Sequence, residues 1–147
     1  NLIKYGTFTT QANDEIARDN KIKQWLISMI DNWNPDLVII EGIQLQDNAS
    51  QRKMGVTVFE TLARLQGILM ETLYELNIDY KIAPTNTWRN HCHVKGVHRA
   101  DRKRSMQLLV KEWFDVSVTD DCADAIGIGK YGAETFKPTS KIEVTIW

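Results

Sequence analysis

Hydrophobic and polar positions along the chain follow two different periods, and strand-like alternation appears near both ends. Residues 2–9 (LIKYGTFT) and 141–147 (KIEVTIW) alternate and are rich in β-branched and aromatic side chains, which predicts a strand in the first and an edge strand in the second. The run at residues 37–41 (LVIIE) is apolar up to its last residue, as expected for a strand covered on both faces. A further short strand is expected at residues 80–83, where Pro84 ends it.

Helical spacing governs the segments between these strands. A first helix is expected to begin at Asn13, because an Asn cap followed by Asp14 and Glu15 satisfies free N–H groups and complements the helix dipole. Asn34-Pro35-Asp36 is a signal that ends it. Its apolar side is formed by Ile16, Ile22, Trp25, Leu26, Met29, Ile30 and Trp33.

The longest expected helix follows a polar connection at residues 42–52 and carries the most regular apolar stripe of the chain. Spacings of three and four residues place the side chains of this stripe on one face. Core packing is the usual role of such a face, but its length also fits a dimer interface. The stripe consists of Val58, Leu62, Leu65, Leu69, Leu73 and Leu76.

Further helices are expected in the second half of the chain. A short one begins at Thr85 or Asn86 and carries Trp88 and Arg89. The tryptophan is interpreted as a core residue, with bracing of the adjacent loop as the alternative. After a loop at residues 91–99, a basic amphipathic helix spans residues 100–114 and buries Met106, Leu109, Val110 and Trp113.

The last helix is expected to begin at Asp120 or Asp121, with Asp120 as its cap. Strands and helices therefore follow one another along the chain, an order that indicates an α/β fold with helices around a mixed sheet. With 147 residues, 43% of them hydrophobic, the chain has the size and the apolar content of one domain.

Composition limits the compartment in which the protein is expected and the metal sites that it can form. No stretch approaches the ~20 apolar residues that span a bilayer, so no membrane association is expected. Cys92 and Cys122 lack the spacing of a disulfide framework, which fits a reducing cytoplasm. A zinc site at His91, Cys92, His93 and His98 is disfavoured, because structural zinc needs about four ligands at paired spacing.

Basic residues gather in one part of a chain whose net charge is only −1. Residues 89–111 contain seven Lys/Arg and a single acid, Asp101. Such a face is expected for phosphate contacts, although a solvated helix surface is an equally good interpretation. The candidate DNA-binding residues are Arg89, His98, Arg99, Arg102, Lys103 and Arg104.

Three carboxylates are candidates for a metal site. Glu41 ends the apolar strand, and Asp121 and Asp124 stand three apart at the start of the last helix, where they share one face. If the fold brings that face against the strand end, the three oxygen donors suit a hard divalent cation. Taken separately, a strand-end charge and acids at a helix start are ordinary structural features.

These segments, taken in order, resemble the RuvC family of Holliday-junction resolvases, and phage-type members from Gram-positive hosts in particular. The matching segments are LVIIEG, YKIAPTNTWR, DRKRSMQ and DDCADAIGIGKYG. The resemblance covers about residues 1–132 and leaves residues 133–147 outside it; its most specific parts are Glu41 after a hydrophobic strand and the block at residues 121–126.

The resemblance implies an RNase H-like fold, a homodimer, a Mg²⁺ cofactor with Mn²⁺ as the alternative, and symmetric nicking of four-way DNA junctions in a bacterial cytoplasm, with a host or prophage gene. It further implies that Glu41, Asp121 and Asp124 are three of four metal-binding acids and that Lys103 lies near the scissile phosphate. Family members begin with an Asp-bearing strand upstream of residues 2–9, so we expect residues 1–147 alone to lack that strand and to be inactive. Competing functions are another RNase H-like nuclease and a non-catalytic junction-binding protein.

Overall fold

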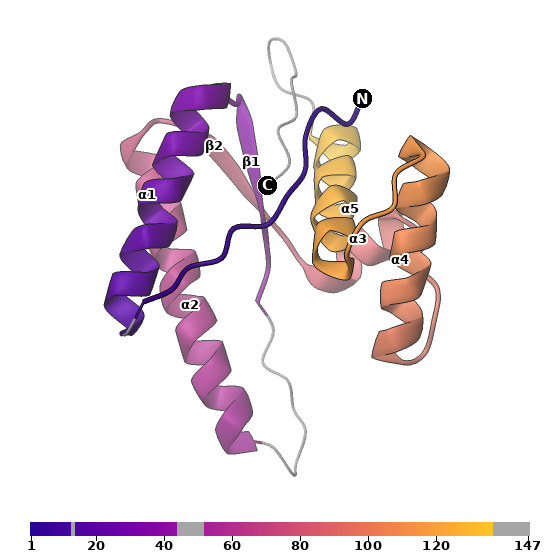
Figure 1. The fold of residues 1–147 in the computed structure, drawn as a ribbon, viewed down its shortest axis with the longest axis horizontal. Coiled ribbons are helices and arrows are strands. Elements are labelled where there is room, and N and C mark those ends of the chain that lie inside the picture. Colours follow the sequence, from indigo (N-terminus) through magenta and orange to yellow (C-terminus); the bar gives the residue numbers. More distant parts are fainter. Residues whose placement is uncertain (13, 44–51, 137–147) are drawn as a thin grey trace.

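The computed structural model describes residues 1–12, 14–43 and 52–136, which form five helices and two strands (Figure 1). The strand expected at residues 141–147 and most of the polar connection after Gly42 lie outside these described residues. The elements are α1 (Glu15–Trp33), β1 (Leu37–Glu41), α2 (Arg52–Glu75), β2 (Asp79–Ala83), α3 (Thr85–His91), α4 (Arg99–Phe114) and α5 (Asp120–Thr135).

The two strands pair in parallel, with Leu37 opposite Asp79 and Glu41 opposite Ala83. A parallel pair needs a long crossover, which α2 supplies. The α/β class expected from the sequence is therefore confirmed. Within the described residues the sheet has these two strands, so a mixed sheet stays a prediction.

The strand predicted at residues 2–9 is wrong, because this segment has no regular secondary structure. It runs across the front of the molecule from the side of α5 to α1 (Figure 1). Its side chains find partners on other elements: Leu2 packs on the core around α5, and Phe8 stacks on Trp25 of α1 at 5.0 Å. The alternating pattern is thus used for side-chain docking and not for backbone pairing.

Both faces of β1 are covered, as its continuous apolar sequence predicts. Val38 and Ile40 belong to a cluster with Leu26 and Ile30 of α1 and Leu73 of α2. Successive strand residues point to opposite faces, so the next side chain, Ile39, faces the other cluster. That second cluster is built by α3, α4 and α5 around Trp88, Met106, Val110 and Ile126.

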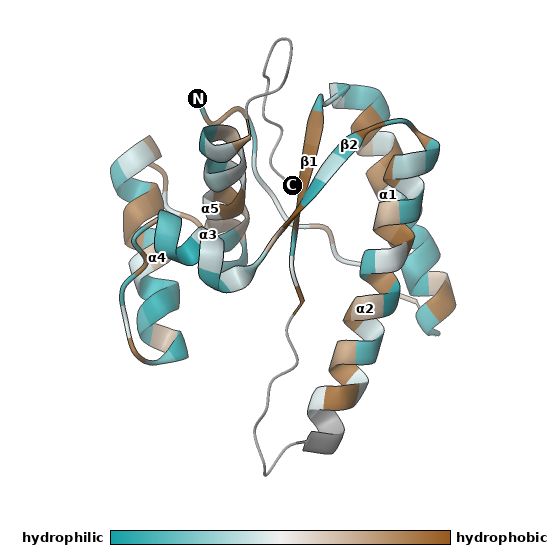
Figure 2. Ribbon diagram, turned by 180° about the vertical axis from the view of Figure 1, so that it is seen from behind, coloured by the Kyte–Doolittle hydropathy of each residue, from teal (hydrophilic) through white to brown (hydrophobic). Residues whose placement is uncertain are grey.

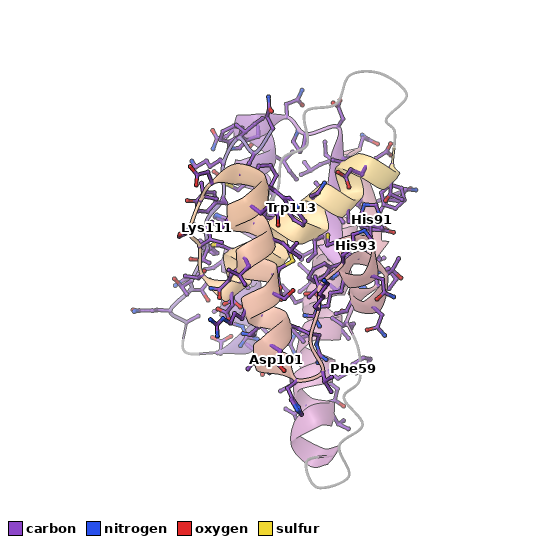
Figure 3. The ribbon with its side chains drawn as sticks, turned by 90° about the vertical axis from the view of Figure 1, so that its right-hand side faces the viewer. Phe59, His91, His93, Asp101, Lys111 and Trp113 are labelled. Atoms are coloured by element: carbon purple, nitrogen blue, oxygen red, sulfur yellow. The ribbon has the colours of Figure 1, made fainter. Side chains whose placement is uncertain are left out.

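Helix α5 lies against this second face of the sheet and is covered by α4. Figure 3 views the molecule from the α4 side, with Trp113 turned toward α5; Lys130 of α5 lies over the Trp113 ring at 5.0 Å from its centroid. The buried face predicted for α4 is confirmed at Met106 and Val110, which are fully buried. The helix begins at Arg99 and α5 continues to Thr135, three residues beyond the stretch covered by the family resemblance.

The caps predicted at Asn13 and Asp120 need correction; Asn13 itself lies outside the described residues. Asp14 caps α1, its side chain accepting a hydrogen bond from the Ala17 N–H at 2.8 Å, and Asn34 ends the helix in the left-handed region with φ 42°. The cap of α5 is Thr119, which accepts from the Cys122 N–H at 3.4 Å. Asp120 does not cap the helix because its carboxylate is engaged by Lys103.

Helix α2 packs on the core over only part of its length. Leu73 is fully buried, whereas Val58 is 56% exposed and Leu62 43% exposed. The half that carries these exposed residues projects beyond the sheet (Figures 1 and 2). Between the two ends, Arg64 of α2 donates from Nε to the buried Asp19 of α1 at 2.7 Å and ties the helices together. Ile16, expected on the buried face of α1, is exposed instead.

None of the helices in the described part of the chain is both long enough and apolar enough to cross a bilayer.

Two helical glycines allow the packing of α5 on β1 to be tested. A Cβ at Gly132 would overlap Ile39 Cγ1, whereas a Cβ at Gly67 of α2 would meet nothing within 4 Å. We expect Gly132→Ala to lower the free energy of unfolding by about 1–2 kcal/mol, since overpacking outweighs the helix propensity of Ala. The control, Gly67→Ala, should raise it by about 0.5–1 kcal/mol. Urea denaturation measures both; equal gains from both variants would contradict the α5–β1 contact.

Candidate functional site

The candidate site lies where β1 and β2 end together. Their last paired residues are Glu41 and Ala83, and the Gly42 N–H continues the pairing by donating to the Ala83 carbonyl at 2.8 Å. A Cβ at Gly42 would lie 3.3 Å from both the Ala83 carbonyl oxygen and Pro84 Cα, so glycine allows this close exit. The carboxyl ends of parallel strands are where α/β folds bind ligands.

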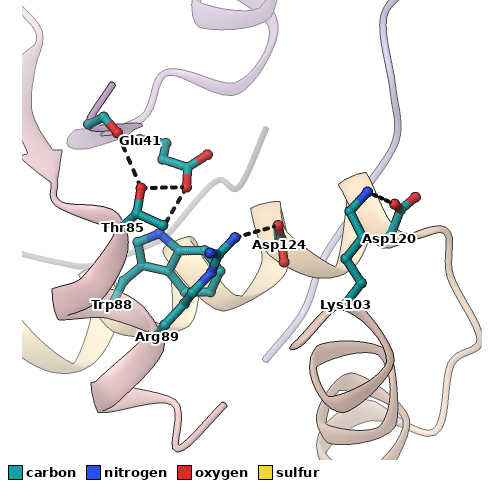
Figure 4. A network of polar contacts seen from close by, with 8 residues as sticks. Glu41, Thr85, Trp88, Arg89, Lys103, Asp120 and Asp124 are labelled. Carbon is teal, nitrogen blue, oxygen red and sulfur yellow. Dashed lines mark hydrogen bonds and ion pairs between the residues drawn. The ribbon is translucent and has the colours of Figure 1, made fainter. Parts of the chain in front are cut away.

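Glu41 is held by two neutral donors from α3. Its Oε1 accepts from the Thr85 hydroxyl at 3.1 Å and from the Trp88 indole N–H at 3.2 Å (Figure 4). The Thr85 hydroxyl also lies 3.3 Å from the Gly42 carbonyl oxygen. Trp88 is fully buried, so its ring fixes the position of its N–H. Both donors converge on one oxygen, which orients the carboxylate.

Asp124 faces this carboxylate from α5. Its side chain is 22% exposed, and Nη2 of Arg89 lies 3.3 Å from its Oδ2. Burial raises the pKa of Asp124, the charge of Arg89 lowers it, and the charge of Glu41 raises it. The net result is a pKa above the usual 3.8 of an aspartate. The two carboxylates are linked through α3, because Trp88 donates to Glu41 and its ring lies under Arg89, which pairs with Asp124.

Lys103 and Asp120 form an ion pair beside Asp124 (Figure 4). The hydrogen bond from Lys103 holds the pKa of Asp120 below its usual range. Asp120 and Asp124 are four residues apart on α5 and so share a face. Lys103 also lowers the pKa of Asp124, although its ammonium contacts Asp120.

Asp121, the remaining predicted metal ligand, is exposed in the first turn of α5. Among the described residues, no three His, Cys, Asp or Glu side chains come together as a metal-binding group. Of the three predicted ligands, Glu41 and Asp124 are the two that contact side chains of α3. Metal ligation by all three acids remains a prediction.

The other candidate DNA-binding residues lie on or beside α4. Arg102 donates to the Val97 carbonyl at 2.6 Å, and the His98 N–H donates to Asp101 at 3.3 Å, so both help to order the start of this helix. Arg99 and Arg104 are exposed. Among the described residues, no contact joins Glu41 or Asp124 to any of these four side chains, which are His98, Arg99, Arg102 and Arg104. Arg89, in contrast, pairs directly with Asp124.

The histidine and cysteine loop has other partners. His91 Nε2 lies 2.8 Å from a carboxylate oxygen of Glu134 on α5. The Cys92 thiol is buried, donates to the Gly127 carbonyl at 3.4 Å, and has its pKa raised to about 11 by that burial. Cys92 would bind zinc only as a thiolate, and its burial disfavours that form.

Thr85 and Trp88 were not identified from the sequence as site residues, although both contact Glu41. Trp88 was interpreted as core, and it is; its indole N–H nevertheless reaches the carboxylate. The signal in the sequence is their spacing: residues three apart at the start of a helix that follows a strand directly share the side facing the strand ends.

The pKa of Asp124 tests the geometry of the site. Glu41→Gln should lower this pKa and Arg89→Gln should raise it, because each substitution removes one of the charges that act on Asp124. The control, Asp36→Asn, removes a charge at the other end of β1, roughly 16 Å away, and should leave it unchanged. The ¹³C shift of the carboxyl carbon during a pH titration measures the midpoint.

The raised pKa of Asp124 determines how the stability of the protein depends on pH. Because the folded protein holds the Asp124 proton more tightly than the unfolded chain, the contribution of this group to stability is greatest at low pH and falls as the pH rises from about 4 through the folded pKa. An Asp124 midpoint that does not respond to Glu41→Gln would show that the two carboxylates are not neighbours.

The chain matches no protein-family model and no curated protein at a significant level. Its function is therefore argued from the chemistry of the site, since an α/β architecture by itself supports many activities.

Proposed function

We propose that this protein is a divalent-cation-dependent endonuclease with an RNase H-like fold that resolves four-way DNA junctions, as RuvC-family enzymes do. The observation that carries the proposal is that Glu41, at a strand end, and Asp124, on a separate helix, both contact side chains of α3, beside a basic helix. Repelling carboxylates in a partly buried position are stabilised by a cation, and hard divalent ions take oxygen ligands.

The donor set fits Mg²⁺, and Mn²⁺ as an alternative. Mg²⁺ in proteins is usually bound by one or two carboxylates, with water and substrate phosphates completing its octahedral shell. Glu41 and Asp124 supply that number of ligands, and Asp121 on the same face of α5 is the proposed third. Such an ion supplies an activated water and charge stabilisation for phosphodiester hydrolysis.

The residues of the chain have distinct tasks in this proposal. Thr85 and Trp88 hold Glu41 in one orientation through its Oε1. Lys103, next to Asp120 and close enough to act on Asp124, offsets negative charge that develops on the phosphoryl group. Arg99, Arg102 and Arg104 form a basic surface on the first turns of α4 that binds the DNA backbone.

A homodimer is part of the proposal, because symmetric nicking needs one site on each of two strands. The exposed apolar residues of α2 support it, since contiguous apolar surface on a helix marks an interaction site. A two-fold dimer through α2 presents the same face from both copies. The two free, buried cysteines suit the reducing cytoplasm in which we place the protein.

Two other functions can be distinguished from this one by the DNA substrates that the protein cleaves or binds. Another RNase H-like nuclease would cleave linear duplex or hybrid substrates as readily as junctions. A non-catalytic junction-binding protein would bind four-way DNA with and without Mg²⁺ but never cleave it. The paired carboxylates favour the enzyme, because a purely DNA-binding surface gains nothing from acids that repel phosphate.

Cleavage by the full-length protein tests the assignment. Glu41→Gln and Asp124→Asn should each reduce Mg²⁺-dependent nicking of a four-way junction on the order of 100-fold or more, because each removes a ligand charge. Junction affinity, measured by gel shift in EDTA, should stay within a few-fold of the wild type. The control, Asp36→Asn, should nick normally. Near-normal nicking by either site variant would refute the proposed roles of these acids.

The dimer is tested by charging the stripe on α2. Leu62→Glu should convert the protein from dimer to monomer, since a charge in an apolar interface loses its hydration. Leu108 of α4 is 60% exposed and provides the matched control: Leu108→Glu should leave the dimer intact. Sedimentation velocity distinguishes the species. A dimeric Leu62→Glu variant would exclude this face of α2 as the interface.

A further inference from the structure

The guanidinium of Arg89 lies between the two carboxylates of the candidate site (Figure 4). Its Nη2 is 3.3 Å from Asp124, and its Cζ lies 5.1 Å from the centroid of the Trp88 ring. The indole of that same tryptophan donates to Glu41. Arg89 is thus linked to both acids, to one directly and to the other through Trp88.

The charges at the site show what this position does. The guanidinium pairs with Asp124 and stacks on the ring whose N–H holds Glu41, so its positive charge offsets the negative charge of the two acids. A guanidinium remains charged at every working pH, and its planar face stacks well on an aromatic ring. The fold therefore contains a positive charge at the place where the proposed function requires a divalent ion.

We propose that Arg89 is a built-in counter-cation that a divalent ion displaces from Asp124, and that the displaced guanidinium then binds a DNA phosphate. This inference rests on the proposed function. Two positive groups at one carboxylate repel each other, so the ion and Arg89 compete for Asp124. Released from Asp124, the planar fork of the guanidinium fits two phosphate oxygens.

Arg89 is well placed for this exchange. Its side chain is 26% exposed, so it reaches solvent from its position beside Asp124. It is also the first residue of the segment in which basic side chains predominate, and that segment continues through α4. Ion binding and phosphate binding would then favour each other: the ion releases the arginine, and the phosphate keeps it away from Asp124.

Affinity for Mn²⁺ in the absence of DNA tests the competition. Arg89→Gln removes the competing charge and should tighten Mn²⁺ binding roughly fivefold or more, the lower end of typical coupling between sites. The control, Lys23→Gln, removes one positive charge from a surface ion pair between α1 and α2 and should leave the affinity unchanged. Electron paramagnetic resonance of free Mn²⁺ measures the dissociation constants without any cleavage assay.

The wild-type protein gives a second measurement that needs no variant. On titration with Mg²⁺, the Nε–H resonance of Arg89 should shift toward the position of a solvent-exposed arginine. Arg64, whose Nε donates to Asp19 at 2.7 Å away from the candidate site, is the internal reference and should not move.

The outcomes separate the two proposals. If the wild type binds Mn²⁺ while Arg89→Gln binds it no more tightly and the Arg89 resonance stays fixed, the counter-cation role is refuted and the nuclease proposal stands. If neither form binds Mn²⁺ at millimolar concentrations, both proposals fail. Tighter binding by the glutamine variant together with a Mg²⁺-dependent Arg89 shift supports the exchange.

Discussion

The parallel pairing of β1 and β2 is the interaction on which the rest of the site depends. The hydrogen bond from the Gly42 N–H to the Ala83 carbonyl, at 2.8 Å, brings both strands to an end at the same level. Glu41 therefore emerges beside the first turn of α3, within reach of Thr85 and Trp88. A shift of one residue in this register would turn Glu41 to the other face of the sheet and break both contacts.

Trp88 connects this local geometry to the stability of the domain. Its ring is fully buried in the cluster of α3, α4 and α5, and its indole N–H meets the Glu41 carboxylate at 3.2 Å. A buried indole N–H needs a partner, so the core and the orientation of the acid are specified together. Asp124 enters the same arrangement through Arg89, which lies over the Trp88 ring.

The sequence predicts the elements whose signals are local. The structure confirms three of them: the strand formed by the β-branched run before Glu41, the end of α1 at Asn34, and the buried apolar side of α4. Each of these signals depends on residues that are close together in the sequence. Residues 2–9 were assigned wrongly because alternation does not distinguish a paired strand from a segment docked by its side chains. Asp120 was assigned wrongly as a cap because Lys103, seventeen residues earlier, binds its carboxylate. The approach of Glu41 to Asp124 depends on how α5 crosses β1, a long-range property that the sequence alone supports only through resemblance.

Each acid in the first two turns of α5 that lies at the site has a basic partner from a neighbouring helix. Asp124 pairs with Arg89 of α3 and Asp120 with Lys103 of α4. Asp124 and Asp120 are thus neutralised before any ligand arrives, which limits the cost of burying Asp124, whereas Glu41 is held by neutral donors. A cation or a phosphate that bound here, as we propose, would take over one partner of an existing ion pair. Such an exchange favours ligands of opposite charge that arrive together, because each takes one member of a pair that the other leaves unpaired.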